Sequence, residues 1–311
     1  MEDRRAIAYD RFGSPKRKDV RNFYARGREV MGEGYDKAAP NPRKGYGNLR
    51  YGESELKAPA LGEDLQDMLI YAFFAFGSPA FAQLVDIYRV ELDRACAENK
   101  VLKGIVVTGL ELGIQRNCPD CITQLGALYY AGQIVPQDYE AVRDLYELAM
   151  GLGSAQAATN LGYIYEYGRT AAPDYAKAYQ CYSFAAAVSD LPEAMYKMGD
   201  ILAKGKGLGK DEQAAFRLWQ RGYRVARDND DIESKAQSAI RIAPYYHNGG
   251  KSDRVGVERD FLYALHLYQE AEIGLRISIR NGFDYYEKKL QQAIDGQNKV
   301  RTYMDGSFFG E

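Results

Sequence analysis

Small and apolar residues recur along the middle of the chain with the spacing of a helix. In the clearest stretch, one stripe consists of Ala158, Leu161, Gly162 and Tyr165. Residues at these intervals share one side of a helix with 3.6 residues per turn. Gly168 and then Asp174 follow, and a second apolar series begins. Glycine favours the end of a helix and aspartate the start of one, so the pattern predicts two helices joined by a short loop.

The same hairpin pattern occurs several times. A Leu-Gly or Met-Gly pair begins at Leu125, Leu161 and Met198, at steps of 36 and 37 residues. The aspartates expected to start the second helices are Asp138, Asp174, Asp211 and, in a stretched fourth copy, Asp260. A single hairpin cannot bury its own apolar face, and self-similarity at this period is typical of a solenoid of stacked hairpins.

This pattern resembles the Sel1-like repeat family, which is related to the tetratricopeptide repeat. The second copy matches the family pattern at Ala158, Leu161, Gly162, Tyr165, Gly168, Asp174, Ala178, Tyr182, Ala185 and Ala186. The other copies depart from it at Cys121, Val142, Leu202 and Gly222, and the fourth has Arg241 and Pro244 in place of glycine and tyrosine. The resemblance implies an all-α fold, a right-handed alpha-alpha superhelical solenoid of Sel1-like, TPR-like helical hairpins with terminal capping helices.

We expect the chain to have four parts. Residues 1–60 form a basic Gly/Tyr-rich extension with at most one helix, about 19–31. Residues 61–117 form a helical cap and a degenerate repeat, with helices near 63–76, 79–97 and 101–115. The repeats occupy 118–282, in units of about 118–154, 155–192, 193–231 and 233–282, the last with an insertion loop at 247–259 and a helix near 260–281. Residues 283–311 form a C-terminal capping helix, about 284–304, and a tail.

Composition and charge change this picture little. The chain has 46% hydrophobic and 27% charged residues and a net charge of −2, so no globally acidic or basic partner is indicated. Residues 1–52 are an exception, with 13 Lys/Arg against 7 Asp/Glu. The uncharged stretch 68–85 approaches the length of a membrane span but is interrupted at Gly77, which predicts two buried helices and no membrane contact. The N-terminus lacks the apolar core of a signal peptide, and the four cysteines do not pair within repeats, so we expect a reducing, cytoplasmic location.

Candidate chemistry is sparse. Cys118 and Cys121 form a C-x-x-C pair, but the repeat register places them at a helix start, so we interpret them as structural, with a redox or metal role as the alternative. The loop 205–210 lacks the first glycine of a phosphate-binding loop. The two histidines, His247 and His266, lie in no catalytic motif. The sequence therefore predicts no catalytic residue, cofactor or metal.

The expected partner surface is the side of the first helices opposite the core stripe. In stacked helical hairpins these helices line the concave face. Residues on that side are rich in tyrosine and mixed in charge, a composition enriched at protein interfaces. The predicted set is Thr123, Gln124, Tyr130, Thr159, Asn160, Tyr163, Glu166, Tyr167, Tyr196, Lys197, Asp200 and Lys204.

As a hypothesis for function, the resemblance implies a non-enzymatic scaffold or adaptor that binds a protein or peptide partner on its concave face. An alternative is a nucleic-acid-associated factor that binds through residues 1–52, where arginines can pair with phosphates and tyrosines can stack on bases. A third possibility is a hydrolase, as proposed for cysteine-rich relatives. It is disfavoured because the cysteine pairs of those relatives are missing here.

Overall fold

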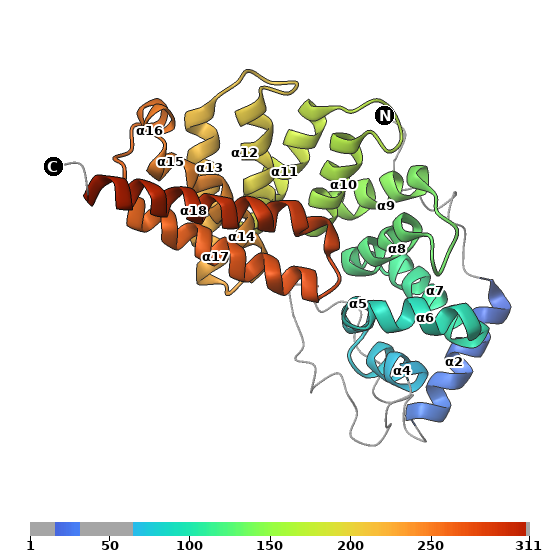
Figure 1. Cartoon of the computed structure of the whole chain (residues 1–311). Coiled ribbons are helices and arrows are strands. Elements are labelled where there is room, and N and C mark those ends of the chain that lie inside the picture. Colours follow the sequence, from blue (N-terminus) through green and yellow to red (C-terminus); the bar gives the residue numbers. More distant parts are fainter. Residues whose placement is uncertain (1–15, 32–64, 309–311) are drawn as a thin grey trace. The chain divides into compact units, whose positions relative to one another are not determined.

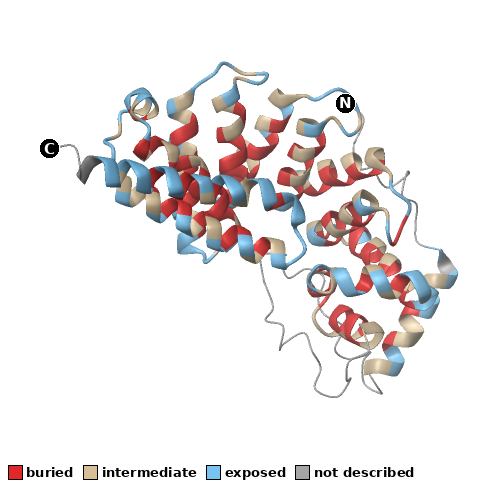
Figure 2. Cartoon of the chain, in the orientation of Figure 1, coloured by how far each residue is buried: buried red, intermediate tan, exposed pale blue. Residues whose placement is uncertain are grey.

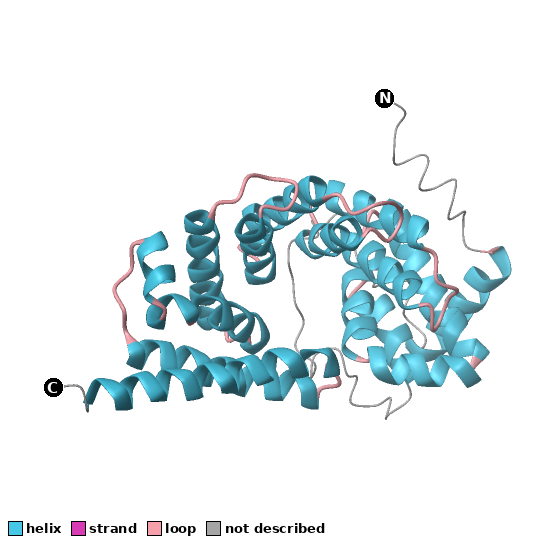
Figure 3. Cartoon of the chain, turned by 45° about the horizontal axis from the view of Figure 1, so that its top comes forward, coloured by secondary structure: helices cyan, strands magenta, loops and turns pink. Residues whose placement is uncertain are grey.

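The computed structural model describes residues 16–31 and 65–308, which form helices joined by loops and contain no strand (Figures 1 and 3). They form two compact units that meet at Ile164 and Tyr165, inside one helix. Within each unit the buried residues lie where neighbouring helices face each other (Figure 2). The predictions for residues 1–15, 32–64 and 309–311 fall outside the described residues.

The first unit contains the N-terminal cap and the first repeat. Its helices are α2 (Arg17–Met31), α4 (Leu65–Ala75), α5 (Ser78–Ile87), α6 (Arg89–Glu98), α7 (Lys100–Gln115), α8 (Pro119–Ala131), α9 (Tyr139–Gly151) and most of α10 (Ala155–Tyr167). The predicted turn between two buried helices is present at Gly77, which has a φ of 95°. Phe23 of α2 packs edge-on against Phe73 of α4. No described helix is both long and apolar enough to cross a membrane.

The second unit contains the later repeats and the C-terminal hairpin. Its helices are α11 (Tyr175–Ser189), α12 (Pro192–Lys204), α13 (Glu212–Asp228), α14 (Ile232–Ile242), α15 (Pro244–His247), α16 (Gly249–Val255), α17 (Phe261–Arg280) and α18 (Glu287–Phe308). A 3₁₀ turn, η2 (Asp284–Tyr286), precedes α18. The helices α17 and α18 lie side by side and antiparallel (Figure 1).

The predicted helix starts and stops are present. The aspartate side chains accept hydrogen bonds from backbone N–H groups three residues further on, at Asp138, Asp174, Asp211 and Asp260. Gly132 and Gly205 end α8 and α12 in the left-handed conformation, with φ of 74° and 65°. These local signals explain why the sequence predicts the hairpins well.

The glycines inside α8 and α12 make room for an aromatic ring. A Cβ atom added at Gly126 would lie 2.5 Å from Tyr146 Cε1, and one at Gly199 would lie 2.4 Å from Trp219 Nε1. Both rings belong to the second helix of the same hairpin. The Trp219 indole also donates a hydrogen bond to the Tyr196 carbonyl at 3.2 Å. In both hairpins the glycine of the first helix and the aromatic ring of the second helix therefore pack directly against each other.

Two predicted elements differ from the structure. The single helix expected over 79–97 is two helices, because the chain turns at Tyr88: α5 is buried on nearly all sides, whereas α6 buries only Leu92 and Cys96. The insertion loop expected over 247–259 contains α16. Ser252 fixes this short helix by donating hydrogen bonds to the Tyr245 and Asn248 carbonyls.

Candidate partner-binding face

One face of α12 carries charged residues in a regular row. Glu193, Lys197, Asp200 and Lys204 follow each other at intervals of three or four residues, which places them along one side of the helix. Around them lie residues of α10, α14, η2 and α18. We call this set the α12 face: Glu166, Tyr167, Glu193, Tyr196, Lys197, Asp200, Lys204, Gln237, Arg241, Tyr285 and Lys289.

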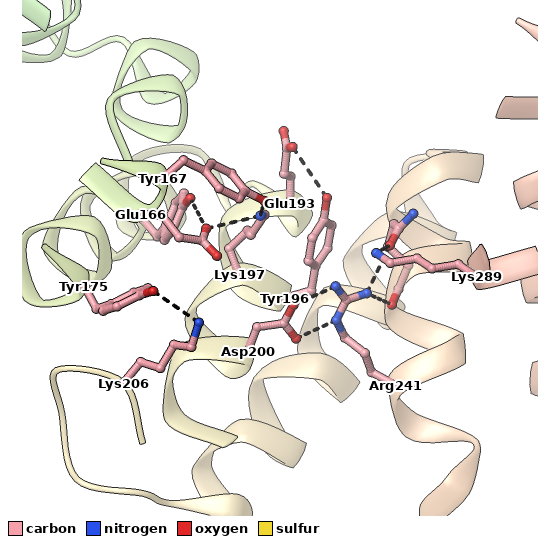
Figure 4. A network of polar contacts seen from close by, with 12 residues as sticks. Glu166, Tyr167, Tyr175, Glu193, Tyr196, Lys197, Asp200, Lys206, Arg241 and Lys289 are labelled. Atoms are coloured by element: carbon pink, nitrogen blue, oxygen red, sulfur yellow. Dashed lines mark hydrogen bonds and ion pairs between the residues drawn. The ribbon is translucent and has the colours of Figure 1, made fainter. Parts of the chain in front are cut away.

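Lys197 links α12 to the end of α10 (Figure 4). Its Nζ donates hydrogen bonds to Glu166 Oε2 and to the Tyr167 hydroxyl, each at 3.2 Å. The Tyr182 hydroxyl donates to the same Glu166 oxygen at 2.8 Å. The Lys197 and Glu166 side chains are only 9% and 15% exposed. A charge this deeply buried needs its partner, so the arrangement holds these side chains in place.

Asp200 links α12 to α14 through a two-pronged ion pair. Arg241 donates from Nε to Oδ1 at 2.6 Å and from Nη2 to Oδ2 at 2.7 Å. The guanidinium also lies 4.6 Å from the centre of the Tyr196 ring. Burial by itself raises the pKa of Asp200, but the charge and hydrogen bonds of Arg241 outweigh it and hold the pKa below its ordinary value.

Lys289 brings α18 to the same place. Its Nζ donates to Gln237 Oε1, which also accepts from Arg241 Nη1 at 3.1 Å (Figure 4). Burial lowers the pKa of Lys289 to about 7, and the positive charge of Arg241 adds to the effect. A lysine in this state loses much of its charge near neutral pH.

Two tyrosines of this face stand out into solvent. Tyr167 is 53% exposed and Tyr285 is 69% exposed. Tyr167 is nevertheless held, since its hydroxyl accepts from Lys197 and the same ammonium lies 5.2 Å from its ring centre. The face therefore combines a fixed charged base with protruding aromatic side chains.

Comparison with known proteins identifies the repeated unit. The family described as Sel1 repeat matches residues 119–154, 155–190, 192–224 and 236–272. These segments are Sel1 repeats. The resemblance of these segments to Sel1-like repeats and the α-solenoid fold, both expected from the sequence, are confirmed. No curated protein sequence matches the chain.

Two solved structures share the fold. The Sel1 repeat protein from Oxalobacter formigenes has 21% sequence identity and a TM-score of 0.53, over 76% of this chain and 94% of that protein. The protein c5321, described as a protective antigen present in uropathogenic Escherichia coli strains displaying an SLR fold, has 22% identity and a TM-score of 0.51. That match covers 76% of this chain and 49% of c5321, so it spans about half of the latter.

The structure divides the predicted partner residues of the Sel1 repeats between the two units. The first unit holds Thr123, Gln124, Tyr130, Thr159, Asn160 and Tyr163, and the second holds Glu166, Tyr167, Tyr196, Lys197, Asp200 and Lys204. The second group comes together on the α12 face.

Some of these residues are buried and cannot present a side chain to a partner. The hydroxyls of Thr123 and Thr159 donate to the carbonyls four residues earlier in their own helices. Thr159 is fully buried, and Tyr196 is 3% exposed beneath Arg241. Lys197, at 8%, is enclosed by the contacts with α10. For Thr123, Thr159, Tyr196 and Lys197, the expectation of an exposed surface position is therefore corrected: these residues support the face from below.

Five residues of the face were missing from the sequence prediction, namely Glu193, Gln237, Arg241, Tyr285 and Lys289. A signal existed for Arg241, because it stands where the repeat pattern expects glycine. Lys289 lies on the polar stripe of its helix, and only the packing of α18 beside α14 reveals that it points inward.

The other candidate groups of the sequence occupy structural positions. Cys118 and Cys121 lie at the start of α8, as the register predicts, and both are fully buried. Burial raises the pKa of Cys121. His247 Nε2 lies 3.0 Å from the Tyr268 hydroxyl, and His266 lies 3.7 Å from Glu270. Within the described ranges, no group of three or more His, Cys, Asp or Glu residues is placed to hold a metal ion.

Proposed function

We propose that the chain is a non-enzymatic scaffold that binds a protein or peptide partner through the first helices of its Sel1 repeats. Sel1 repeats commonly mediate protein–protein interaction and are typically non-catalytic. The observation that carries the proposal is the α12 face, where an exposed tyrosine stands on a base of buried ion pairs. A cytoplasmic location remains the expectation from the sequence.

Preorganisation makes this face suited to binding. An interface loses free energy when mobile side chains become ordered on association, on the order of 0.5–1.5 kcal/mol for each flexible side chain. Tyr167 avoids much of this loss because its hydroxyl is already held by Lys197. Tyrosine also offers a large apolar ring and a polar tip, which is why it is enriched among the residues that dominate binding energy.

The test places a photo-crosslinking amino acid at Tyr167 or at Tyr130 and recovers covalent adducts from the native host. The control carries the same amino acid at Val188, which is 49% exposed on α11, a second helix of a repeat. We expect a specific protein to be crosslinked from Tyr167 or Tyr130 but not from Val188. In a binding assay with that protein, Tyr167→Ala should weaken affinity by roughly 30-fold, the equivalent of about 2 kcal/mol.

Equal crosslinking from Val188 would show that the first helices have no special role. Unchanged affinity of the Tyr167→Ala protein would remove the α12 face from the binding site. The nucleic-acid alternative rests on residues 1–52, of which 16–31 are described. There, Arg26 is engaged by Asp67 and Glu29, so it helps to dock α2 on α4.

A further inference from the structure

We propose that the segment bound on the α12 face presents an acidic side chain, glutamate or aspartate, to Lys289 and Lys204. This inference rests on the proposed function and specifies the chemistry of the partner. Neither of these two lysines has a carboxylate partner among the described residues, and a bound carboxylate would supply one.

The acidic side chains of this region are engaged by groups other than Lys204 and Lys289. Lys197 is paired with Glu166, and Arg241 is paired with Asp200. Glu193 and Glu233 accept hydrogen bonds from the hydroxyls of Tyr196 and Tyr286. In the described part of the chain, neither Lys204 nor Lys289 forms an ion pair, which leaves two ammonium groups for an incoming anion.

The hydrogen-bond acceptors are also too few. The ammonium of Lys289 is held by Gln237 Oε1, a neutral amide oxygen that Arg241 shares. The amide of Gln237 is thereby oriented with its nitrogen away from these cations. Gln237 is fully buried, and this nitrogen has no hydrogen-bond partner. A buried donor without an acceptor is unfavourable, and a carboxylate at Lys289 would relieve the competition between Lys289 and Arg241 for the amide oxygen.

Aromatic side chains flank this position. The centres of the Tyr285 and Tyr286 rings lie 4.4 Å apart, and the Lys289 ammonium lies 5.5 Å from the centre of the Tyr286 ring. Tyr167 and Tyr285 are the exposed aromatic groups of the α12 face. These two rings can pack against apolar residues that flank an acidic residue in a peptide, whereas a small free anion would make no contact with them.

Binding of a carboxylate should be linked to proton uptake. Lys289 faces Lys197, Asp200 and Lys204 of α12 and Arg241 of α14, with Tyr286 and Glu233 beside it. Burial and the neighbouring cations lower its pKa to about 7. A bound carboxylate favours the charged ammonium and raises this pKa. Affinity for an acidic segment should therefore increase as the pH falls from about 8.5 to 6, above the range in which the carboxylate of a glutamate side chain is itself protonated.

The experiment uses N-acetylated, amidated nonapeptide libraries with randomised flanks and a fixed central Glu, Gln or Leu, so that terminal carboxylates play no part. We expect the full chain to bind the Glu-centred library roughly tenfold more tightly than the Gln-centred one, equivalent to about 1.4 kcal/mol. Lys289→Met should abolish the preference and its pH dependence, and Lys289→Arg should keep the preference without the pH dependence near 7. Lys288→Met, an exposed neighbour on α18, is the matched control and should bind like the unmodified protein.

The outcomes separate the two proposals. If Glu- and Gln-centred peptides bind equally and both are lost in Tyr167→Ala, the scaffold remains and the acidic segment is refuted. If no library binds to the α12 face, the proposed function fails there as well. A single-stranded oligonucleotide that displaces the Glu-centred peptides as well as they displace each other would show a general attraction for polyanions, and would also refute the inference.

Discussion

The packing of Tyr146 against Gly126 leads to a sharp prediction for Gly126→Ala. The added Cβ would lie 2.5 Å from Cε1, 2.9 Å from Cδ1 and 3.2 Å from Cζ of the tyrosine ring, where carbon atoms normally approach to about 3.5–4.0 Å. The ring has little room to move, since Tyr146 is only 3% exposed. The methyl group must therefore displace a packed ring.

The expected change in the free energy of unfolding for Gly126→Ala follows from two opposing effects. Overpacking of this kind costs about 1–3 kcal/mol, whereas replacement of glycine by alanine inside a helix gains up to about 1 kcal/mol. We expect a net destabilisation of about 1–2 kcal/mol. Because a solenoid can unfold in parts, hydrogen exchange of the α8 and α9 amides is the appropriate local assay, supported by thermal unfolding.

Two comparisons test the reasoning. Gly104→Ala in α7 adds a Cβ with no atom within 4 Å and should be neutral or stabilising. In a Tyr146→Leu background the ring is gone, so Gly126→Ala should lose its cost, a coupling visible in a double-mutant cycle. If Gly126→Ala were equally destabilising in both backgrounds, the ring would not be the reason for the glycine.

Two further predictions concern charged groups of the second unit. Asp200→Asn leaves Arg241 without its carboxylate, and we expect a loss of about 2–3 kcal/mol in urea unfolding, less in the Asp200→Leu/Arg241→Met double variant. The pKa of Asp200 is lower in the folded state, so its contribution is present above about pH 4 and is lost as the pH falls through the folded value; an unchanged acid limb in Asp200→Asn would contradict this. Burial lowers the pKa of His247, so the stability due to its neutral form is complete above about pH 6.5 and declines as the pH falls below that value. His247→Gln should flatten this decline, while the exposed His266→Gln should leave it in place, and the same slope in both variants would exclude His247 as the cause.

The hairpins were predictable because their signals are local. Asp138 and Asp211 start their helices through bonds to N–H groups three residues away, and Gly132 and Gly205 end them through their own backbone conformation. Such features need no knowledge of the rest of the fold. The turn at Tyr88 escaped prediction since it depends on how many sides of α5 the neighbouring helices cover.

The α12 face was predictable only in part. A helical repeat of apolar positions distinguishes a buried side from an open one, but a helix inside a stack is covered on several sides. Tyr196 lies opposite the core stripe of α12 and is still buried, because Arg241 of α14 covers its ring. Lys289 belongs to a polar stripe and still points inward. Both depend on contacts between residues more than 40 positions apart, which no local pattern contains.

The irregularity of the fourth repeat explains how α18 comes to take part in the α12 face. Where the repeat pattern expects glycine, this repeat has Arg241, which binds Asp200 and shares Gln237 with Lys289. Its aromatic residue, Tyr268, instead packs on Gly296 of α18, where an added Cβ would lie 2.4 Å from the ring. The glycine that receives the ring has thus moved from the first helix of the repeat to the C-terminal helix. This exchange leaves the old position free for an arginine and fixes α18 beside it, so the departure from the repeat pattern is what brings Lys289 to the proposed binding face.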